Sequence, residues 1–218
     1  AFSKDHIINL NANDAFQSEF RSKHSVVVLD DIANTNKNFV KESPLQMVID
    51  MVNNLPKAVL SPIAELKGKI QMRPLLVMGT TNINSIDAGS YSNCPSSILS
   101  RFNYHISVSV KPEYREHNTM RLRQEQFDTI DLWAFTVKKA RQANDDIKSF
   151  EFVVVKDDNK ELVNISLSEL ISFCVKESQK HFANQRSIVD RMNTFEERPL
   201  CDHFNYREIC DVCNAVPS

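Results

Sequence analysis

Two adjacent carboxylates, a later asparagine and an arginine are the side chains whose types and order suggest chemistry. Asp30 and Asp31 end an apolar run at residues 26–29. Asn82 follows a second apolar run, and Arg101 lies in the segment SILSRF. Two carboxylates at a buried strand end are costly unless a cation lies beside them. In phosphoryl transfer a carboxylate holds the metal, a polar group orients water and a guanidinium offsets charge on the γ-phosphate. We therefore expect a Mg²⁺–nucleotide site here.

The elements that must position these residues follow the pattern of an α/β sheet. A strand is predicted at residues 25–29, of which 26–29 are apolar on both faces, as in a strand buried within a parallel sheet. Ligands of open α/β sheets bind at the carboxyl ends of the strands. Ser43 and Gln46 form a capping box that opens a helix ending at Pro56, and a short helical turn follows Pro95. Further strands are predicted at residues 6–10, 75–78 and 104–110.

The pattern changes after about residue 112. Residues 114–143 predict a polar helix, and a hairpin is predicted at 150–166 around the turn Asp157-Asp158-Asn159. Ser166 and Glu169 form a second capping box, which opens a helix to about residue 193. We divide the chain into an α/β region with the expected nucleotide site, a helical region with the hairpin, and a cysteine-rich tail, at residues 1–112, 113–198 and 199–218.

Composition limits the classes of protein to which the chain can belong. The net charge of −2 gives no global basic field, so a contact with nucleic acid must be local. No apolar run approaches the length that crosses a bilayer. Five cysteines without a secretory signal indicate a reducing compartment. The three glycines do not form G-x-x-x-x-G-K-[ST], so the chain contains no phosphate-binding loop, and we expect it to be a fragment or a processing product.

The tail offers a set of zinc ligands. Cys210-x-x-Cys213 has the spacing of a zinc knuckle, and Cys201 with His203 would complete a tetrahedron. The spacing of Cys201 and His203 is tighter than usual, so reduced, unliganded cysteines in the tail are an equal alternative.

A local basic segment offers a nucleic-acid contact. Lys67, Lys69 and Arg73 surround a loop with Gly68 at its tip. Three cations in seven residues would hold an RNA backbone, and several copies in a ring would concentrate the charge. A solvated loop is nearly as good an interpretation.

Four segments together resemble the superfamily 3 helicases, specifically the picornavirus-like non-structural ATPases. The segment VVVLDDI resembles their Walker B motif, and LLVMGTTN resembles the sensor strand with its terminal Asn. The segment CPSSILSRFNYHISVSV is similar to the part that carries the arginine finger and the next strand. AELKGKI, at residues 64–70, resembles the stretch that faces the central pore in related helicases. The resemblance covers roughly residues 15–115.

This resemblance implies an AAA+-like P-loop NTPase fold, and an ATP-dependent RNA helicase or remodelling enzyme of a small positive-strand RNA virus, acting as a hexameric ring. It implies that Asp30 coordinates Mg²⁺ with ATP, Asp31 polarises the attacking water, Asn82 senses the γ-phosphate and Arg101 reaches a neighbouring subunit's site. Implied partners are RNA and other viral replication proteins. The implied location is the host cytoplasm at membrane-associated replication complexes, with membrane contact only through regions outside this chain. Relatives also carry a cysteine-rich zinc element near this end.

The chain departs from that family in two respects. The P-loop and its strand, which the family places between the strands at 75–79 and 104–110, would lie upstream of Ala1. We therefore expect the chain alone to bind ATP poorly and to fold less stably than the complete domain. Arg101 stands alone where many relatives have two adjacent arginines.

Simpler interpretations stand beside the functional ones. Asp30 and Asp31 would then cap a turn, Asn82 would close an Asx-turn, and Arg101 would form a surface salt bridge. A non-catalytic scaffold that binds RNA or builds oligomers is the alternative to the enzyme. A cellular ring ATPase is a third option, disfavoured by the short connections between the strands.

Overall fold

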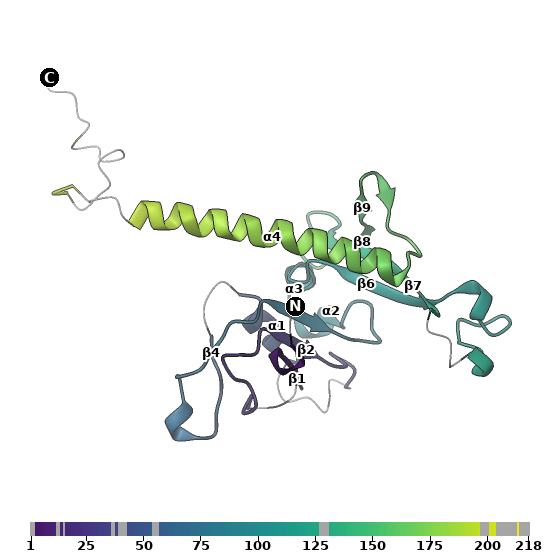
Figure 1. Ribbon diagram of the computed structural model, residues 1–218, viewed down its shortest axis with the longest axis horizontal. Coiled ribbons are helices and arrows are strands. Elements are labelled where there is room, and N and C mark those ends of the chain that lie inside the picture. Colours follow the sequence, from purple (N-terminus) through teal and green to yellow (C-terminus); the bar gives the residue numbers. More distant parts are fainter. Residues whose placement is uncertain are drawn as a thin grey trace. The chain divides into compact units, whose positions relative to one another are not determined.

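The chain forms two compact units in the computed structural model (Figure 1). The N-terminal unit consists of residues 1–128 and 132–164, and the C-terminal unit of residues 129–131 and 165–218. The predicted boundaries at 112 and 198 stay predictions. The structure describes residues 3–11, 14, 16–35, 38, 43–53, 57–126, 131–196, 201–203 and 213.

A parallel three-stranded sheet lies at the centre of the N-terminal unit. Its strands are β1 (Ile7–Leu10), β2 (Val26–Leu29) and β5 (Leu76–Gly79), in the order β1-β2-β5. All are parallel, and Leu29 pairs with Leu10 on one side and Gly79 on the other. The central strand is buried, since Val27 and Leu29 are each 0% exposed. The strands predicted at 6–10, 25–29 and 75–78 are therefore confirmed, the first two beginning one residue later than predicted and the last shifted by one residue.

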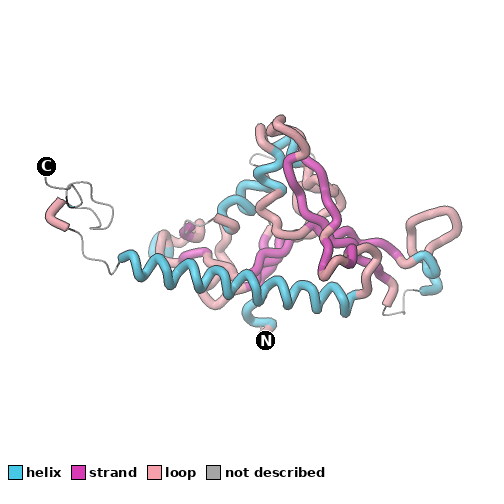
Figure 2. Tube along the Cα trace, turned by 90° about the horizontal axis from the view of Figure 1, so that it is seen from above, coloured by secondary structure: helices cyan, strands magenta, loops and turns pink. Residues whose placement is uncertain are grey.

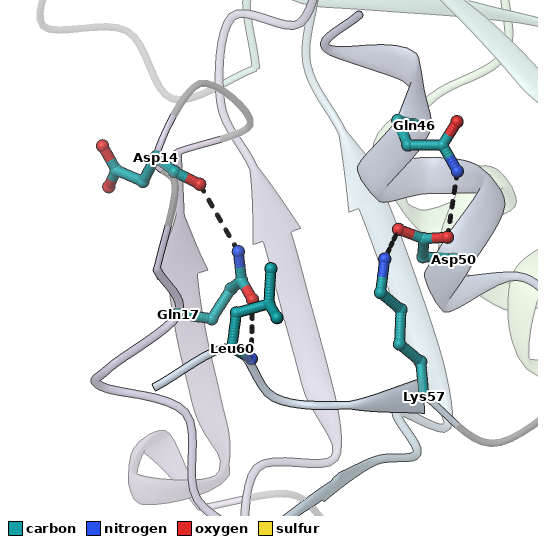
Figure 3. A network of polar contacts seen from close by, with 6 residues as sticks. All are labelled: Asp14, Gln17, Gln46, Asp50, Lys57 and Leu60. Atoms are coloured by element: carbon teal, nitrogen blue, oxygen red, sulfur yellow. Dashed lines mark hydrogen bonds and ion pairs between the residues drawn. The ribbon is translucent and has the colours of Figure 1, made fainter. Parts of the chain in front are cut away.

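Three short helices belong to the same unit: α1 (Leu45–Met51), α2 (Ala88–Tyr91) and α3 (Pro95–Leu99). The predicted helical turn after Pro95 is confirmed by α3. The capping box predicted for α1 is wrong, because the Gln46 side chain turns away from the helix start and donates from Nε2 to Asp50 Oδ1 at 3.0 Å (Figure 3). Ser43 Oγ instead accepts from the backbone N–H of Leu45 at 3.3 Å. The predicted end at Pro56 lies outside the described residues.

An antiparallel sheet corrects the predicted helix over 114–143. β6 (His105–Val110) pairs with β7 (Trp133–Gln142), and β7 pairs with β8 (Phe150–Val154). Residues 112–126 hold turns, 3-10 helices at Pro112–Tyr114 and Gln124–Gln126, and an isolated antiparallel bridge between Arg115 and Leu122. The strand β7 is favoured over a helix because its Ala134 and Val137 are buried in the sheet, with 3% and 0% of their surface exposed. Aromatic and β-branched residues also favour strands.

A hairpin and a long helix follow the antiparallel sheet along the chain. The turn residues Asp158 and Asn159 have left-handed φ values of 47° and 68°, as a tight two-residue hairpin requires. Its arms are shorter than predicted.

The capping box of Ser166 and Glu169 is confirmed in both directions, at 2.9 and 3.3 Å. The remaining elements are the 3-10 helices Lys4–His6 and Ala64–Leu66, the strands β3 (Lys57–Ala58), β4 (Gln71–Met72), β9 (Lys156–Asp157) and β10 (Lys160–Glu161), and α4 (Leu167–Glu196), one continuous helix in Figure 2.

One core unites the elements of the N-terminal unit. Its largest fully buried side chains come from the parallel strand β2, from α1 and α3, and from the connecting segments: Phe20, Leu29, Ile32, Leu45 and Leu99. Phe150 and Phe152 of β8 pack against the same cluster. No helix within the described ranges is both long enough and apolar enough to pass through a lipid bilayer.

The close approach at Gly79 generates a stability prediction. A Cβ at Gly79 would lie 2.5 Å from Ile32 Cδ1, and Ile32 is 1% exposed. Gly79→Ala should therefore lower the free energy of unfolding by about 1–3 kcal/mol, through overpacking. Urea unfolding followed by far-UV circular dichroism measures the change.

Gly89→Ala is the matched control, because nothing lies within 4 Å of its added Cβ and Gly89 is in the helix α2. Alanine there should be neutral or stabilise by up to about 1 kcal/mol. Equal effects of the two substitutions would contradict the packing assigned to the end of β5.

Candidate functional site

The two predicted carboxylates lie at the carboxyl end of β2, beside the residues that follow β5. Because Leu29 pairs with Gly79, the next residues of the two strands are also neighbours. Thr80 N–H donates to Leu29 O at 2.9 Å, and Ile32 N–H donates to Thr80 O at 2.8 Å. The parallel pairing therefore continues past the strand ends and fixes the acidic segment against the segment that contains Asn82.

Thr80 joins both carboxylate residues through one hydroxyl. Its Oγ1 donates to Asp30 Oδ1 and accepts from the backbone N–H of Asp31, the latter at 2.9 Å. The sequence interpretation gave Thr80 no role, although a hydroxyl residue directly after the apolar strand β5 could have indicated a polar residue of the site. The hydroxyl sets the direction in which Asp30 leaves the sheet.

Both oxygens of Asp31 accept from side-chain amides. Asn82 Nδ2 donates to Asp31 Oδ1 at 3.3 Å, and Asn34 Nδ2 donates to Asp31 Oδ2 at 3.0 Å. The structure thus brings together three predicted residues, Asp30, Asp31 and Asn82. It adds Asn34, which the sequence analysis did not identify because an Asn in a turn has many ordinary uses.

The backbone that presents Asp31 is in an uncommon conformation. Asp31 and Ala33 have left-handed φ values of 56° and 61°. Asp tolerates this region, whereas Ala there costs roughly 1–2 kcal/mol. The turn is held by the buried Ile32, whose carbonyl accepts from Thr81 Oγ1 at 2.9 Å. Such conformations persist where the surrounding structure determines them, and they are frequent at functional sites.

The chemistry available at this edge is that of hard oxygen ligands. Asp30 and Asp31 are both exposed, and a threonine hydroxyl lies between them. Carboxylate, hydroxyl and amide oxygens suit Mg²⁺, which keeps several of its waters and binds through one or two carboxylates. The oxygen atoms gathered here are therefore of the type that Mg²⁺ prefers.

Arg101 lies apart from this hydrogen-bonded group. Its Nη1 donates to the carbonyl of Val52, which caps the end of α1, at 3.2 Å. Its Nε is buried without a partner among the described residues. The contacts described for Arg101 link it to α1 and not to Asp30 or Asp31, so its role toward a neighbouring subunit stays a prediction.

The three predicted RNA-binding cations lie on and after the loop between β3 and β4. Lys67 and Lys69 surround Gly68, whose φ of 73° makes the turn left-handed. All three cationic side chains, including Arg73, are exposed. The structure therefore leaves them accessible, as the prediction requires.

In the C-terminal unit, Cys201, His203 and Cys213 form a group that could bind a metal ion. Their ligand atoms lie within 4.8 Å of one another. His203 Nδ1 is 3.8 Å from Cys201 Sγ and 3.4 Å from Cys213 Sγ. Ligands of a tetrahedral zinc ion are separated by about 3.5–3.8 Å, from its bond lengths. The fourth predicted ligand, Cys210, lies outside the described residues.

Comparisons with known proteins do not assign the chain to a family. No known protein family matches it, and no curated protein is significantly similar to it. The functional proposal therefore depends on the site itself.

The bridging hydroxyl generates a prediction of its own. Thr80→Val keeps the shape of the side chain but removes the donor to Asp30 and the acceptor for the Asp31 N–H. The free energy of unfolding should fall by about 1 kcal/mol, the net worth of a typical hydrogen bond. Thr80→Ser retains the hydroxyl and should change it by less than about 0.5 kcal/mol. If serine costs as much as valine in chemical denaturation, the hydroxyl does not connect the two strands.

Proposed function

We propose that this chain is part of an ATP-hydrolysing RNA helicase or remodelling enzyme of viral genome replication, which acts as a ring of identical subunits with an AAA+-like P-loop NTPase fold. The observation that carries the proposal is the group of Asp30, Asp31 and Asn82 at the carboxyl ends of two parallel strands. Ligands of open α/β sheets bind at this edge.

In this proposal Asp30 and Asp31 have different roles, one toward the metal ion and one toward the attacking water. Asp30 would hold Mg²⁺, which neutralises phosphate charge when it is bound with the nucleotide. Asp31 would accept the proton of the attacking water, with its carboxylate oriented by Asn34 and Asn82. Asn82 would also bind the γ-phosphate, and Arg101 would serve a neighbouring subunit.

Exposed apolar side chains on two strands support a larger ATPase sheet. Leu76 and Met78 of β5 are 44% and 50% exposed, and Ile106 and Val108 of β6 are 41% and 57% exposed. β5 and β6 each lie at the edge of a described sheet, so a further strand could pair with both, and the proposed fold places the strand before the P-loop there. The exposed apolar side chains project from the sheet faces, which further elements of a complete domain would cover. The proposal needs a phosphate-binding loop that these 218 residues do not contain, so its test uses an N-terminally extended protein with such a loop.

Asp31→Asn in the extended protein tests the proposal. Asparagine tolerates the left-handed φ of 56° at this position, so the backbone should be retained while the base is lost. ATP hydrolysis, measured as phosphate release, should fall by about 10²–10⁴-fold, the usual contribution of a general base.

Asp5→Asn is the matched control, since it also neutralises an exposed carboxylate but lies in the 3-10 helix before β1, at the opposite end of the parallel strands from Asp31. Its hydrolysis rate should equal that of the parent protein. An Asp31→Asn variant as active as its parent would overturn the role of Asp31. An extended protein that binds RNA without hydrolysing ATP would instead favour the non-catalytic scaffold.

We also propose that the cysteine–histidine group binds Zn²⁺, with Cys201, His203 and Cys213 as ligands and Cys210 as the fourth. Thiolate and imidazole donors in this number are typical of structural zinc sites. The separations of the three described ligand atoms fit a single ion.

The zinc content of the purified chain should be about one ion per molecule, from elemental analysis, because four-coordinate structural sites are closed and bind tightly. Cys213→Ser should release it. Cys94→Ser removes a cysteine of the N-terminal unit and should leave the zinc content unchanged. Less than stoichiometric zinc in the parent chain, or equal zinc in both variants, would contradict the site.

A further inference from the structure

A basic pocket lies in the N-terminal unit at the end of the sheet opposite the acidic residues. It has a volume of about 310 Å³ and is lined by Phe20, Ser22, His24, Lys69, Gln71 and Arg73. His24 precedes β2 and Arg73 precedes β5, whereas Asp30 follows β2. Six residues of extended chain separate His24 from Asp30, roughly 20 Å. The pocket is therefore distinct from the proposed nucleotide site.

One wall of the pocket is the segment with Phe20, Ser22 and His24, and the other is the segment with Lys69, Gln71 and Arg73. A buried glutamine fixes the two walls to each other. Gln17 is 8% exposed and forms two hydrogen bonds with Leu60, of which Figure 3 shows the one made by its side chain. Its N–H donates to Leu60 O at 3.0 Å, and its Oε1 accepts from Leu60 N–H at 3.3 Å. Leu60 belongs to the loop that leads from β3 to β4, and Gln17 leads into the wall around Phe20. The space between the walls is thus part of the folded unit.

Further backbone bonds hold each wall in place. Ser25 O accepts from the N–H groups of Leu75 and Leu76, at 2.8 and 3.1 Å, so the segment after His24 runs beside the segment after Arg73. On the other wall, Gln71 Nε2 donates to Gly68 O at 3.4 Å and supports the turn that carries Lys69.

The lining favours an anion. Lys69 and Arg73 are cationic, Ser22 and Gln71 are polar, and none of the lining residues that the structure describes carries a carboxylate. His24 Nδ1 accepts from the Arg21 N–H at 2.9 Å, which leaves Nε2 to carry the hydrogen of the neutral ring and donate. The pKa of His24 is lowered by partial burial and then by Lys23, Arg21 and His6, so the surroundings are positive.

Phe20 does not serve as a stacking surface for a base. It is 1% exposed and packs edge-on against the His24 ring, with 5.6 Å between the ring centroids. It therefore forms the floor of the pocket, and the polar groups at the rim define the ligand. The volume is near the lower limit of small-ligand sites, enough for a single nucleotide unit.

We infer that this pocket binds a backbone phosphate of single-stranded RNA, with Lys69 and Arg73 neutralising its charge and His24 and Ser22 donating hydrogen bonds. The choice of RNA rests on the proposed function. The inference separates Lys69 and Arg73, which line the pocket, from Lys67, which lies two residues from Lys69 and does not line it. It therefore replaces the sequence-based prediction that Lys67 also holds the RNA backbone.

Charge-matched variants of the full chain test the pocket. Lys69→Gln, Arg73→Gln and Lys67→Gln each remove one positive charge. The probe is a short fluorescein-labelled single-stranded RNA, titrated by fluorescence anisotropy over a range of salt concentrations. Lys69→Gln and Arg73→Gln should each weaken binding by roughly three- to tenfold at low salt and lower the slope of log K against log salt by about 0.7. Lys67→Gln should leave affinity and slope unchanged.

Two neutral variants test the hydrogen bonds apart from charge. Ser22→Ala and His24→Ala, assayed above pH 7.5 with folding checked by circular dichroism, should weaken binding by several-fold without changing the salt slope, because no cation is lost. Ser22 is exposed, so Ser22→Ala remains decisive if His24→Ala does not fold.

Several results would overturn the inference. Equal losses in the three glutamine variants would indicate diffuse loop charge, and no loss in any would exclude a phosphate contact. Displacement of the RNA by polyglutamate of equal charge would indicate an acidic protein partner instead.

Phosphate release by the extended protein separates the pocket inference from the proposed ATPase activity. If the extended protein hydrolyses ATP but the three glutamine variants bind RNA equally well, only the pocket inference is wrong. If RNA binding depends on the pocket residues but the extended protein does not hydrolyse ATP, only the proposed ATPase activity is wrong.

Discussion

The pairing register of β2 with β5 is the constraint on which the site depends. β2 is buried on both faces and pairs on both sides, and Leu29 lies opposite Gly79. A shift of one residue would turn every side chain of β2 to the other face and separate Asp30 from Thr80. The core and the acidic site therefore require the same register, and Gly79 permits it because Ile32 occupies the space where its Cβ would be.

The same two strands place unlike charge at their two ends. The carboxyl ends carry the exposed carboxylates, and the segments before the amino ends carry the basic pocket with Lys69 and Arg73. Because short parallel strands in a packed sheet are stiff, the two groups keep a fixed separation. An enzyme that bound nucleotide at one end and RNA at the other would hold the two ligands on the same pair of strands.

Two local sequence signals gave correct predictions, because the structures that they predict close within a few residues. The reciprocal bonds of Ser166 and Glu169 close within one helical turn, and the Asp158–Asn159 turn needs only its own two residues. The signal for Gln46 failed because Asp50, one turn further along α1, offered its carboxylate to the same amide. The predicted helix over 114–143 failed for a nonlocal reason, since β7 gains its stability by pairing with β6 and β8, which a helical periodicity count does not include.

The sequence by itself determined the buried strand at 26–29, the order of Asp30, Asp31 and Asn82, and the cationic loop around Gly68. Only the tertiary structure decided that Thr80 bridges the two acids, that Asn34 shares Asp31 with Asn82, and that His24 shares a pocket with Lys69. The physical reason is distance along the chain. Thr80 lies 50 residues after Asp30, and such contacts exist only once burial of the sheet offsets the entropy of closing the intervening loop.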